Sequence, residues 1–527
     1  MKRGCWAVGL GLLIVAGGLA LRLPQLDRRP MHGDEAVHAV KFDGLWRTGE
    51  YVYDPEEYHG PVLYYATLPI VWLSGARTLA ETTEATFRLV PVLFGVGLIL
   101  LLLLVADGLG RGATLAAGVL TALSPVLVFY SRYYIQEMLL AFFAFAVIGC
   151  GWRYAQSRRI MWAVLAGTSI GLMHATKETC IISYGGMLTA LALTVAWERR
   201  WRSAWKRLRP GAVVWGGAAA VVVSVLVFSS LGQNLRGPWD SLRAYGTYFE
   251  RAGGAGLHDH AWYYYLQMLA YWRAAPGPWW SEALILVLAL GGGMVALRRE
   301  AKGNTEGGCH GRAPGGGLVR FVALYGAFIV VVYSVIPYKT PWCLIQFFHP
   351  LVLLAGVGAA AVPGWMRGSR RRAVVATVLG LAAGQLGWQA WRAAYRFCGD
   401  YRNPYVYAHP LSGVVRAADW VERLAQVHAD GWDMLVRVVA DDSWPLPWYL
   451  RRLNRVGFWE RPPEEVAAPV VIVTNDLAES LPAAFTGEDT YQVSTYGLRP
   501  DVRLLVYVER GLYEEFARRE EAATHGP

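Results

Sequence analysis

The sequence predicts an all-α polytopic transmembrane bundle with a small α/β domain at its C-terminal end. Hydrophobic residues make up 54% of the 527 residues and charged residues only 17%, whereas soluble domains carry about 25% charged residues. Eleven apolar stretches approach the ~20 residues that a helix needs to cross the hydrocarbon core of a bilayer. The basic residues lie in short clusters between these stretches, a pattern that predicts topology.

The eleven stretches are predicted to be transmembrane helices. They span residues 5–23, 87–106, 113–131, 134–152, 161–176, 179–197, 211–230, 281–297, 319–336, 342–362 and 373–391. The first resembles a signal peptide, but it lacks a clean small-x-small cleavage site and many apolar stretches follow it. We therefore interpret 5–23 as a retained first helix.

Basic residues gather in alternate connections, which all fall on one side if the eleven spans are correct. The clusters are Lys2/Arg3, Arg111, Arg153/Arg158/Arg159, Arg199 to Arg209, Arg298/Arg299/Lys302/Arg312 and Arg367/Arg370/Arg371/Arg372. The positive-inside rule makes that side cytoplasmic. We expect a multi-pass protein of the cell membrane with a cytoplasmic N-terminus. Because the number of spans is odd, the C-terminal domain is expected on the extracytoplasmic side.

Charge and cysteine usage exclude several other classes. The formal charge of +10 belongs to the loop clusters rather than to a continuous basic patch, so no nucleic-acid partner is expected. The six cysteines have no CxxC or zinc-ligand spacing, which argues against a disulfide framework or a structural zinc.

The predicted transmembrane domain covers residues 1–391 and includes a long first outer loop at 24–86. Residues 392–527 form the predicted soluble extracytoplasmic α/β domain. Strand-like stretches occur there at 434–439, 469–474 and 502–508, with helical patterns at 411–428 and 511–521. A second outer loop, 231–280, is rich in Tyr and Trp and predicts helices lying in the membrane interface. Gly303–Gly317 has the composition of a flexible linker.

The stretch Met31–His38 (MHGDEAVH) carries two adjacent acids, Asp34 and Glu35, just beyond the first span. If a helix begins near Asp34, its side chain shares a face with His38 at i+4. A partly desolvated acid at the bilayer surface suits general-base chemistry. The structural alternative is that Asp34 caps an interfacial helix, which is common for aspartate.

Three outward connections each carry a basic residue near the membrane surface: Arg132, Lys177 and Lys339. Glu137 and Glu178 lie beside the first two, and His59 lies in the first outer loop. Charges at this depth often mark pathways or sites, although each of them could also be solvated and structural. Cations suit a phosphate held at the headgroup level. Together with an acid that removes a proton, they suit group transfer from a lipid-linked phosphate, but spacing alone does not distinguish this activity from transport.

Several motifs resemble the GT-C membrane glycosyltransferases. They are Gly33–His38 (GDEAVH), Tyr53–Pro55, Tyr58–Tyr65 (YHGPVLYY), Lys177–Thr179, Lys339–Trp342 (KTPW) and Ser443–Arg451 (SWPLPWYLR). Within that superfamily the chain looks most like the prokaryotic "flippase activity-associated" putative glycosyltransferases. These are related to the dolichyl-phosphate-mannose–protein mannosyltransferases and the lipid A aminoarabinose transferases.

The resemblance implies a GT-C fold of about eleven spans and an inverting hexosyl- or mannosyl-type transfer from a polyprenyl-phosphate sugar on the extracytoplasmic face. It implies catalytic roles for Asp34 first and Glu35 second. The implied donor-phosphate contacts are Arg132, Lys177 and Lys339, and the implied acceptor or supporting residues are His38, His59, Glu137 and Glu178.

No cofactor is certain, because some GT-C enzymes use a divalent metal ion and others do not. Asp34, His38, His59 and Glu137 are the candidate ligands. Trp444–Trp448 is expected to pack the C-terminal domain onto the bundle or to help bind the acceptor, which is a lipid, a glycan or a protein. The alternative function is a flippase, or an accessory subunit of one, for lipid-linked oligosaccharides. A flippase partner and membrane lipids are further expected partners. A membrane scaffold is the third possibility, but it needs neither the paired acids nor the basic hairpins.

Overall fold

The computed structural model describes residues 2–56, 59–199, 209–253, 258–298, 316–482, 485 and 490–525. Most of the predicted basic loop 199–209 and of the predicted linker Gly303–Gly317 lies outside these residues, as do Tyr58, Arg299, Lys302 and Arg312. The chain divides into two compact units. The helical unit comprises Met1–Leu26, Leu45–Ile70 and Arg88–Tyr407, and the sheet unit comprises Asp27–Gly44, Val71–Phe87 and Ala408–Pro527.

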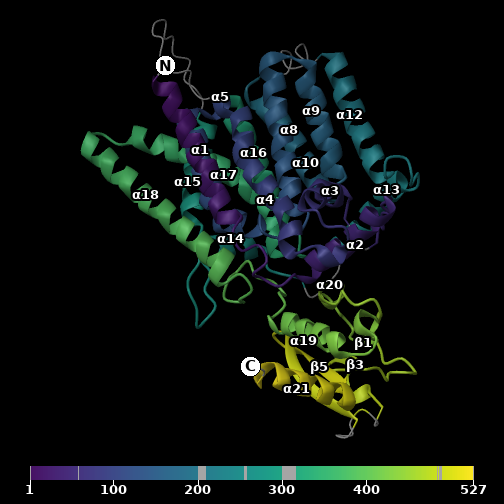
Figure 1. Cartoon of the computed structure of the whole chain (residues 1–527). Helices are drawn as coiled ribbons and strands as arrows, with labels where there is room; N and C mark the ends of the chain where they lie inside the picture. The colour runs from purple at the N-terminus through teal and green to yellow at the C-terminus, as the bar shows by residue number, and fades with distance from the viewer. Residues whose placement is uncertain are drawn as a thin grey trace, which may run out of the picture. The chain divides into compact units, whose positions relative to one another are not determined.

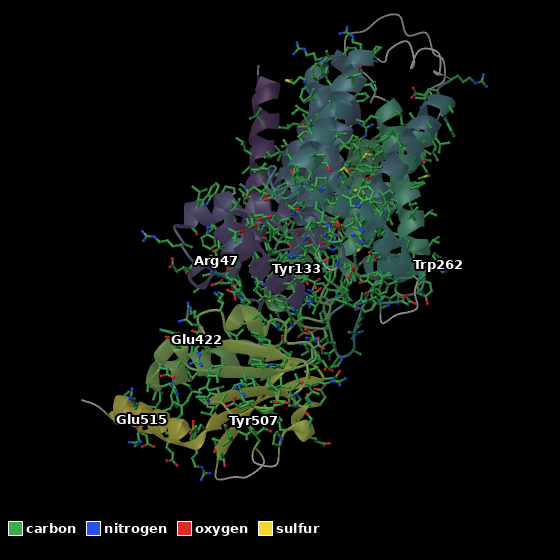
Figure 2. All side chains as sticks on the ribbon, turned by 90° about the vertical axis from the view of Figure 1, so that its right-hand side faces the viewer. Arg47, Tyr133, Trp262, Glu422, Tyr507 and Glu515 are labelled. Carbon is green, nitrogen blue, oxygen red and sulfur yellow. The ribbon has the colours of Figure 1, made fainter. Side chains whose placement is uncertain are left out.

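The helical unit is built from antiparallel apolar helices (Figure 1). Its helices are α1 (Lys2–Arg22), α3 (Val62–Ser74), α4 (Glu84–Leu101), α5 (Ala106–Leu109), α6 (Arg111–Leu123), α7 (Pro125–Tyr130), α8 (Glu137–Ser157), α9 (Ile160–His174), α10 (Cys180–Trp197), α12 (Pro210–Phe228), α13 (Gly237–Gly253), α14 (Tyr264–Ala270), α15 (Ala283–Leu297), α16 (Gly316–Val335), α17 (Ile345–Trp365) and α18 (Ser369–Trp391). Buried aromatic residues such as Tyr133 lie inside this unit, whereas Trp262 lies at its edge (Figure 2).

Each of the eleven predicted spans coincides with helix. Among the described residues, seven helical segments are long and apolar enough to cross a membrane by length and composition. They are Glu84–Leu104, Glu137–Ser157, Cys180–Trp197, Pro210–Phe228, Gly316–Val335, Pro341–Trp365 and Ser369–Arg396. The other four predicted spans fall on the shorter apolar helices Val8–Arg22, Arg111–Leu123, Ile160–His174 and Ala283–Leu297. The predicted class, a polytopic helical bundle with a small C-terminal sheet domain, is confirmed.

One predicted span, 113–131, is interrupted at Ser124, which separates α6 from α7, and α7 begins with Pro125. Proline has no N–H and disfavours helical geometry in the residue before it. Ser124 accordingly has extended angles and caps α7 by accepting from the N–H of Leu127. The fully buried Glu282 accepts hydrogen bonds from the Ser124 hydroxyl and the Val126 N–H, each at 2.8 Å. The donors freed by the break are therefore satisfied inside the unit.

The sheet unit contains most of α2 (Gly33–Thr48) and a five-stranded sheet of order β2-β1-β3-β5-β4, of which β1, β3 and β5 are labelled in Figure 1. The strands are β1 (Val436–Val439), β2 (Val456–Trp459), β3 (Val470–Thr474), β4 (Tyr491–Arg499) and β5 (Val502–Glu509). β1 pairs in parallel with β2 and β3, and β5 pairs antiparallel with β3 and β4. The helices are α19 (Gly413–Val427), α20 (Leu446–Tyr449) and α21 (Arg510–His525).

The sequence predicts three of these strands and both long helices. All five residues of the central strand β3 are buried, which explains its continuous apolar run. In α19 the buried residues Val414, Ala417, Val421 and Leu424 recur at helical spacing. The short strand β2 and the mixed strand β4 are not predicted, because β2 is only four residues long and β4 alternates buried and exposed residues irregularly.

Two helices of the helical unit, α15 and α17, approach each other closely through glycines. A Cβ atom built on Gly292 would lie 2.0 Å from the Leu354 carbonyl oxygen, and one built on Gly358 would lie 2.0 Å from that of Leu288. Small residues allow such backbone contact between apolar helices. We predict that Gly292→Ala destabilises the detergent-solubilised protein by about 1–3 kcal/mol, because the backbones must separate.

The neighbouring Gly293 is the matched control, because a Cβ atom there meets nothing within 4 Å. Gly293→Ala should leave the thermal unfolding midpoint near that of the wild type. Equal midpoints for Gly292→Ala and Gly293→Ala would contradict the close packing of α15 on α17.

Candidate active site

Helix α2 begins at Gly33, and His32 occupies its N-cap position. The His32 Nδ1 atom accepts a hydrogen bond from the backbone N–H of Asp34 at 3.0 Å. The Glu35 carboxylate reaches back and accepts the N–H of His32, also at 3.0 Å. This reciprocal pattern is a capping box with histidine in the place of serine or threonine. The cap that the sequence offered as an alternative role for Asp34 is therefore supplied by His32 and Glu35.

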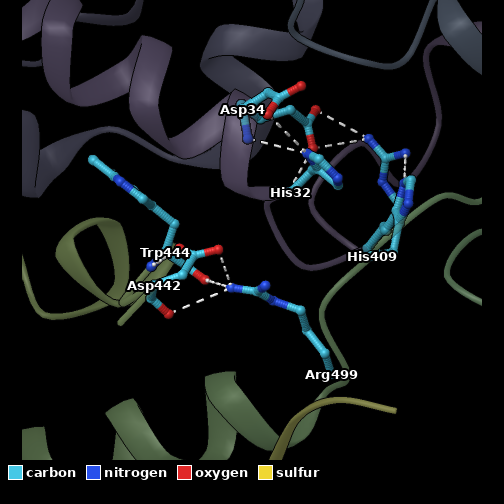
Figure 3. A network of polar contacts seen from close by, with 8 residues as sticks. His32, Asp34, His409, Asp442, Trp444 and Arg499 are labelled. Atoms are coloured by element: carbon cyan, nitrogen blue, oxygen red, sulfur yellow. Dashed lines mark hydrogen bonds and ion pairs between the residues drawn. The ribbon is translucent and has the colours of Figure 1, made fainter. Parts of the chain in front are cut away.

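Glu35 also forms a buried ion pair with Arg29. The Arg29 Nη2 atom donates to both Glu35 oxygens at 3.0 Å, and Arg29 Nη1 lies 2.9 Å from His409 Nε2 (Figure 3). The three residues are at most 6% exposed. Because a guanidinium can only donate, His409 Nε2 is the acceptor in this hydrogen bond. This network joins Arg29, in the segment before α2, to His409, near the start of the C-terminal part of the sheet unit.

Asp34 is placed differently from its neighbour. Its side chain is 47% exposed, and its Oδ1 atom lies 3.7 Å from His32 Nδ1 (Figure 3). Within the described part of the chain, the Asp34 carboxylate accepts no hydrogen bond. His38, one helical turn further on, is buried and lies on the same face of α2 as Asp34. Of the two candidate acids, Asp34 is the one whose carboxylate is accessible for chemistry.

The motif Ser443–Arg451 has two structural parts. Trp448 is fully buried, donates from its indole N–H to Glu84 at 3.1 Å, and contacts the Phe87 ring edge-on. Trp444 is only partly buried. Its Cβ atom would lie 3.6 Å from a Cβ atom built on Gly33, so it lies beside the start of α2. Trp448 therefore packs within the sheet unit, whereas Trp444 lies beside Gly33 at the start of α2.

In the helical unit, the first outer loop is held by Glu178, between α9 and α10. The Glu178 carboxylate accepts from the Tyr53 hydroxyl and pairs with His59 Nδ1, both at 2.8 Å. Burial opposes ionisation of this carboxyl, but His59 and the Tyr53 hydroxyl outweigh it and lower the pKa of Glu178. The predicted residues His59 and Glu178 are therefore direct partners.

Lys177 and Glu137 form a second pair of predicted residues. The Lys177 ammonium donates to the Glu137 carboxylate, and the two side chains are 8% and 3% exposed. Gln346 donates to the Glu137 carbonyl oxygen at 2.9 Å, which ties the start of α8 to α17. Removing either charge of such a buried pair strongly destabilises the folded protein, because the remaining charge stays buried without its partner.

Lys339 and Arg132 instead donate to backbone carbonyls at helix ends. The Lys339 ammonium bonds the carbonyls of Ile336, just after α16, and of His260. Burial lowers its pKa, although Asp259 offsets part of this effect. The Arg132 guanidinium donates to carbonyls at the C-terminal end of α1, those of Arg22 and Pro24 at 2.7 Å. Cations are favoured at helix C-termini, so both residues have a visible structural role.

The structure thus groups the predicted site residues in small sets. Asp34, Glu35 and His38 share α2, and the pairs His59–Glu178 and Lys177–Glu137 are direct contacts. Over the described ranges, no three His, Cys, Asp or Glu side chains group as metal ligands. Of the four candidate ligands, Asp34 and His38 belong to the sheet unit and His59 and Glu137 to the helical unit, and we derive no step through a metal ion.

Sequence reasoning missed Arg29, His32 and His409. His32 precedes the acidic pair directly, and its position three residues before Glu35 is the capping-box spacing, which is a usable signal. Arg29 and His409 are 380 residues apart, and no local pattern links them.

Residues 67–228 match the family model described as dolichyl-phosphate-mannose-protein mannosyltransferase. A search of curated proteins finds no match. Among solved structures, the chain is similar to ArnT from Cupriavidus metallidurans bound to undecaprenyl phosphate, with a TM-score of 0.64 and 16% identity over 96% of this chain and 99% of that one.

A second similar structure is the archaeal oligosaccharyltransferase AglB from Archaeoglobus fulgidus, in complex with an inhibitory peptide and a dolichol-phosphate. Its TM-score is 0.56 at 12% identity, over 97% of this chain and 77% of that one. Both similarities extend over nearly the whole chain. The chain therefore has the GT-C fold, as the resemblance of its motifs implied, and it is a membrane protein.

Because of the Arg29–Glu35 pair, we predict that neutralising Glu35 destabilises the protein strongly, whereas neutralising the adjacent Asp34 hardly changes its stability. Glu35→Gln leaves the buried Arg29 charge without its partner and should cost about 3–5 kcal/mol. Asp34→Asn replaces a half-exposed carboxylate that accepts no hydrogen bond within the described residues, and it should change stability by less than about 0.5 kcal/mol. Thermal unfolding of the purified variants measures both, and a destabilised Asp34→Asn would contradict the assignment of the cap to His32 and Glu35.

The lowered pKa of Glu178 predicts an acid-sensitive loop. A carboxyl whose folded-state pKa is lowered gives its full stabilisation above the ordinary glutamate pKa of about 4.3, and loses it as the pH falls further. Proteolysis within the first outer loop should therefore increase between about pH 4.3 and pH 3. Glu178→Gln should flatten this dependence, whereas Glu50→Gln in the same loop should reproduce the wild-type profile.

Proposed function

We propose that the protein is an inverting glycosyltransferase that moves a sugar from a polyprenyl-phosphate donor to an acceptor on the extracytoplasmic face of the membrane. The observation that carries this proposal is the state of the two adjacent acids on α2. Glu35 is fully buried and paired with Arg29, whereas the Asp34 carboxylate is 47% exposed and accepts no hydrogen bond within the described residues. A rigid frame holding one accessible carboxylate is what a general base requires.

In the proposed reaction, Asp34 removes the proton from an acceptor hydroxyl as its oxygen attacks the anomeric carbon of the donor sugar. The bond between that carbon and the phosphate oxygen breaks on the opposite face, so the anomeric configuration inverts. The phosphate leaves with the bonding electron pair and remains on the polyprenyl chain. Asp34 keeps the proton until water removes it.

The leaving phosphate needs cationic partners, and Lys339 is the first candidate. Within the described residues its ammonium donates to three backbone carbonyls and forms no ion pair with a carboxylate, so a donor phosphate would replace one of these carbonyls as its partner. Lys177 is already paired with Glu137, and Arg132 donates to the end of α1. We assign these two a supporting electrostatic role at the phosphate.

The comparisons support the donor class. The ArnT structure contains undecaprenyl phosphate and the AglB structure contains a dolichol-phosphate, which are both polyprenyl phosphates. The positive-inside pattern supports a cytoplasmic N-terminus and an extracytoplasmic reaction. The acceptor is proposed to be a glycan, a lipid or a protein bearing a hydroxyl group.

A flippase, or a subunit that acts with one, is the second candidate function. Transporters concentrate charges near the bilayer midplane, often in interrupted repeats. Lys177, Glu178 and Lys339 instead lie in connections between helices, which favours chemistry at the membrane surface.

Transfer by the purified protein in liposomes tests the proposal, using radiolabelled polyprenyl-phosphate sugars and a crude extract of membrane glycans. Asp34→Asn should lower kcat about 10²–10⁴-fold, because it removes the base but not the fold. The control Asp501→Asn changes an exposed acid at the turn between β4 and β5 and should retain activity. Full activity in Asp34→Asn would refute the base, and labelled lipid crossing the bilayer without transfer would favour the flippase.

Lys339→Met tests the phosphate contact separately. It should raise KM for the donor about tenfold or more, since each 1.4 kcal/mol of lost binding is a factor of ten. The control Lys41→Met alters a lysine of α2. An unchanged donor KM in Lys339→Met would mean that Lys339 only secures the end of α16.

A further inference from the structure

The turn Asp441–Trp444, between β1 and α20, lies beside the start of α2. Residue 33 immediately precedes Asp34, and a Cβ atom built on it would lie 3.6 Å from the Cβ atom of Trp444, which is a van der Waals contact. The turn and Asp34 belong to the same compact unit. Figure 3 shows Asp34, Asp442 and Trp444 in one close view. The turn is therefore a neighbour of the proposed base.

Arg499, the last residue of β4, holds this turn in one conformation. Its Nη2 atom donates to the Asp442 carboxylate at 2.6 Å and to the carbonyls of Trp444 at 3.2 Å and Asp442 at 3.4 Å. The Asp442 carboxylate also accepts the backbone N–H of Trp444 at 3.1 Å. A charge-assisted hydrogen bond of this kind is stronger than one between neutral groups. The position of Trp444 is thus fixed from the sheet.

The turn leaves two side chains available. Trp444 is partly exposed, in contrast to the fully buried Trp448 four residues later. Asp441 is exposed, and its carboxylate has no hydrogen-bond or ion-pair partner within the described ranges. Because Trp448 already provides the packing against Phe87 and Glu84, burial does not explain a second tryptophan here.

A pyranose ring is the chemical group that matches this pair. One face of a sugar ring carries C–H groups, which pack on the face of an indole, and its edge carries hydroxyls, which donate to carboxylates. Binding sites of this kind combine one aromatic surface with a few placed polar groups. We propose that Trp444 and Asp441 form a subsite for the acceptor sugar, which brings one of its hydroxyls to Asp34.

An extended peptide fits the turn less well. Peptides commonly bind through backbone hydrogen bonds to a free strand edge. In this turn the Trp444 N–H and the carbonyls of Asp442 and Trp444 are already used by Asp442 and Arg499. The available groups are side chains, which favours a glycan acceptor over a protein acceptor.

The subsite rests on the proposed transferase function, so the test separates the two. Transfer is measured against increasing concentrations of methyl glycosides of mannose, glucose and galactose, and against a short Ser/Thr-rich peptide. Trp444→Ala should raise KM for the preferred glycoside about tenfold, the equivalent of 1.4 kcal/mol, with no change in donor KM. Trp444→Phe should recover part of this loss, because it restores an aromatic face.

Two further variants test the architecture of the subsite. Asp441→Asn should raise acceptor KM and shift the preference among the three glycosides. Arg499→Gln should raise acceptor KM by releasing the turn, as expected of a positioning residue. The matched control is Trp432→Ala, which removes another partly exposed tryptophan of the same unit, in the 3₁₀ turn at Gly431–Asp433, and should behave as the wild type.

Binding is also measured without turnover, by saturation-transfer NMR of the methyl glycosides with Asp34→Asn protein in nanodiscs. Loss of the glycoside signal in the Asp34→Asn/Trp444→Ala double variant supports the subsite even if no donor is accepted. An unchanged signal, or an acceptor KM for Trp444→Ala equal to that of Trp432→Ala, overturns it. Transfer to the peptide alone would keep the transferase function and reject the sugar subsite.

Discussion

The buried pair of Arg29 and Glu35 determines the geometry at the start of α2. Its charges are shielded from water, so neither partner can be removed cheaply, and Arg29 also engages His409. The same carboxylate closes the cap on His32. One acid thereby satisfies both a guanidinium and a helix terminus. The backbone of its neighbour Asp34 is fixed by this cap, while the Asp34 carboxylate accepts no hydrogen bond within the described residues.

Buried cations of the helical unit are also satisfied by local partners. Arg132 and Lys339 donate to carbonyls that the ends of α1 and α16 would otherwise leave unsatisfied, and Lys177 is balanced by Glu137. Like Lys339, the fully buried Arg22 donates to backbone carbonyls within the described residues. Each of these charged side chains therefore has a local partner within the helical unit.

The sequence predicts this architecture well where the signal is local. Apolar length predicts the helices, and continuous β-type runs predict β1, β3 and β5. The break at Ser124–Pro125 was missed because apolar composition continues through it. The candidate acids and cations were found from motifs, but their partners were not, since Arg29–His409 and Lys177–Glu137 are defined only by tertiary contact. The exposure that separates Asp34 from Glu35 likewise has no sequence signal.

The interruption between α6 and α7 also has a consequence for biosynthesis. Its hydrogen-bond acceptor, Glu282, lies 158 residues after Ser124, so the ribosome completes the break long before the carboxylate exists. Until α15 is inserted, the free N–H of Val126 must be satisfied by water or lipid headgroups. The two hydrogen bonds from Ser124 and Val126 to Glu282 can therefore form only after the chain has been synthesised as far as α15.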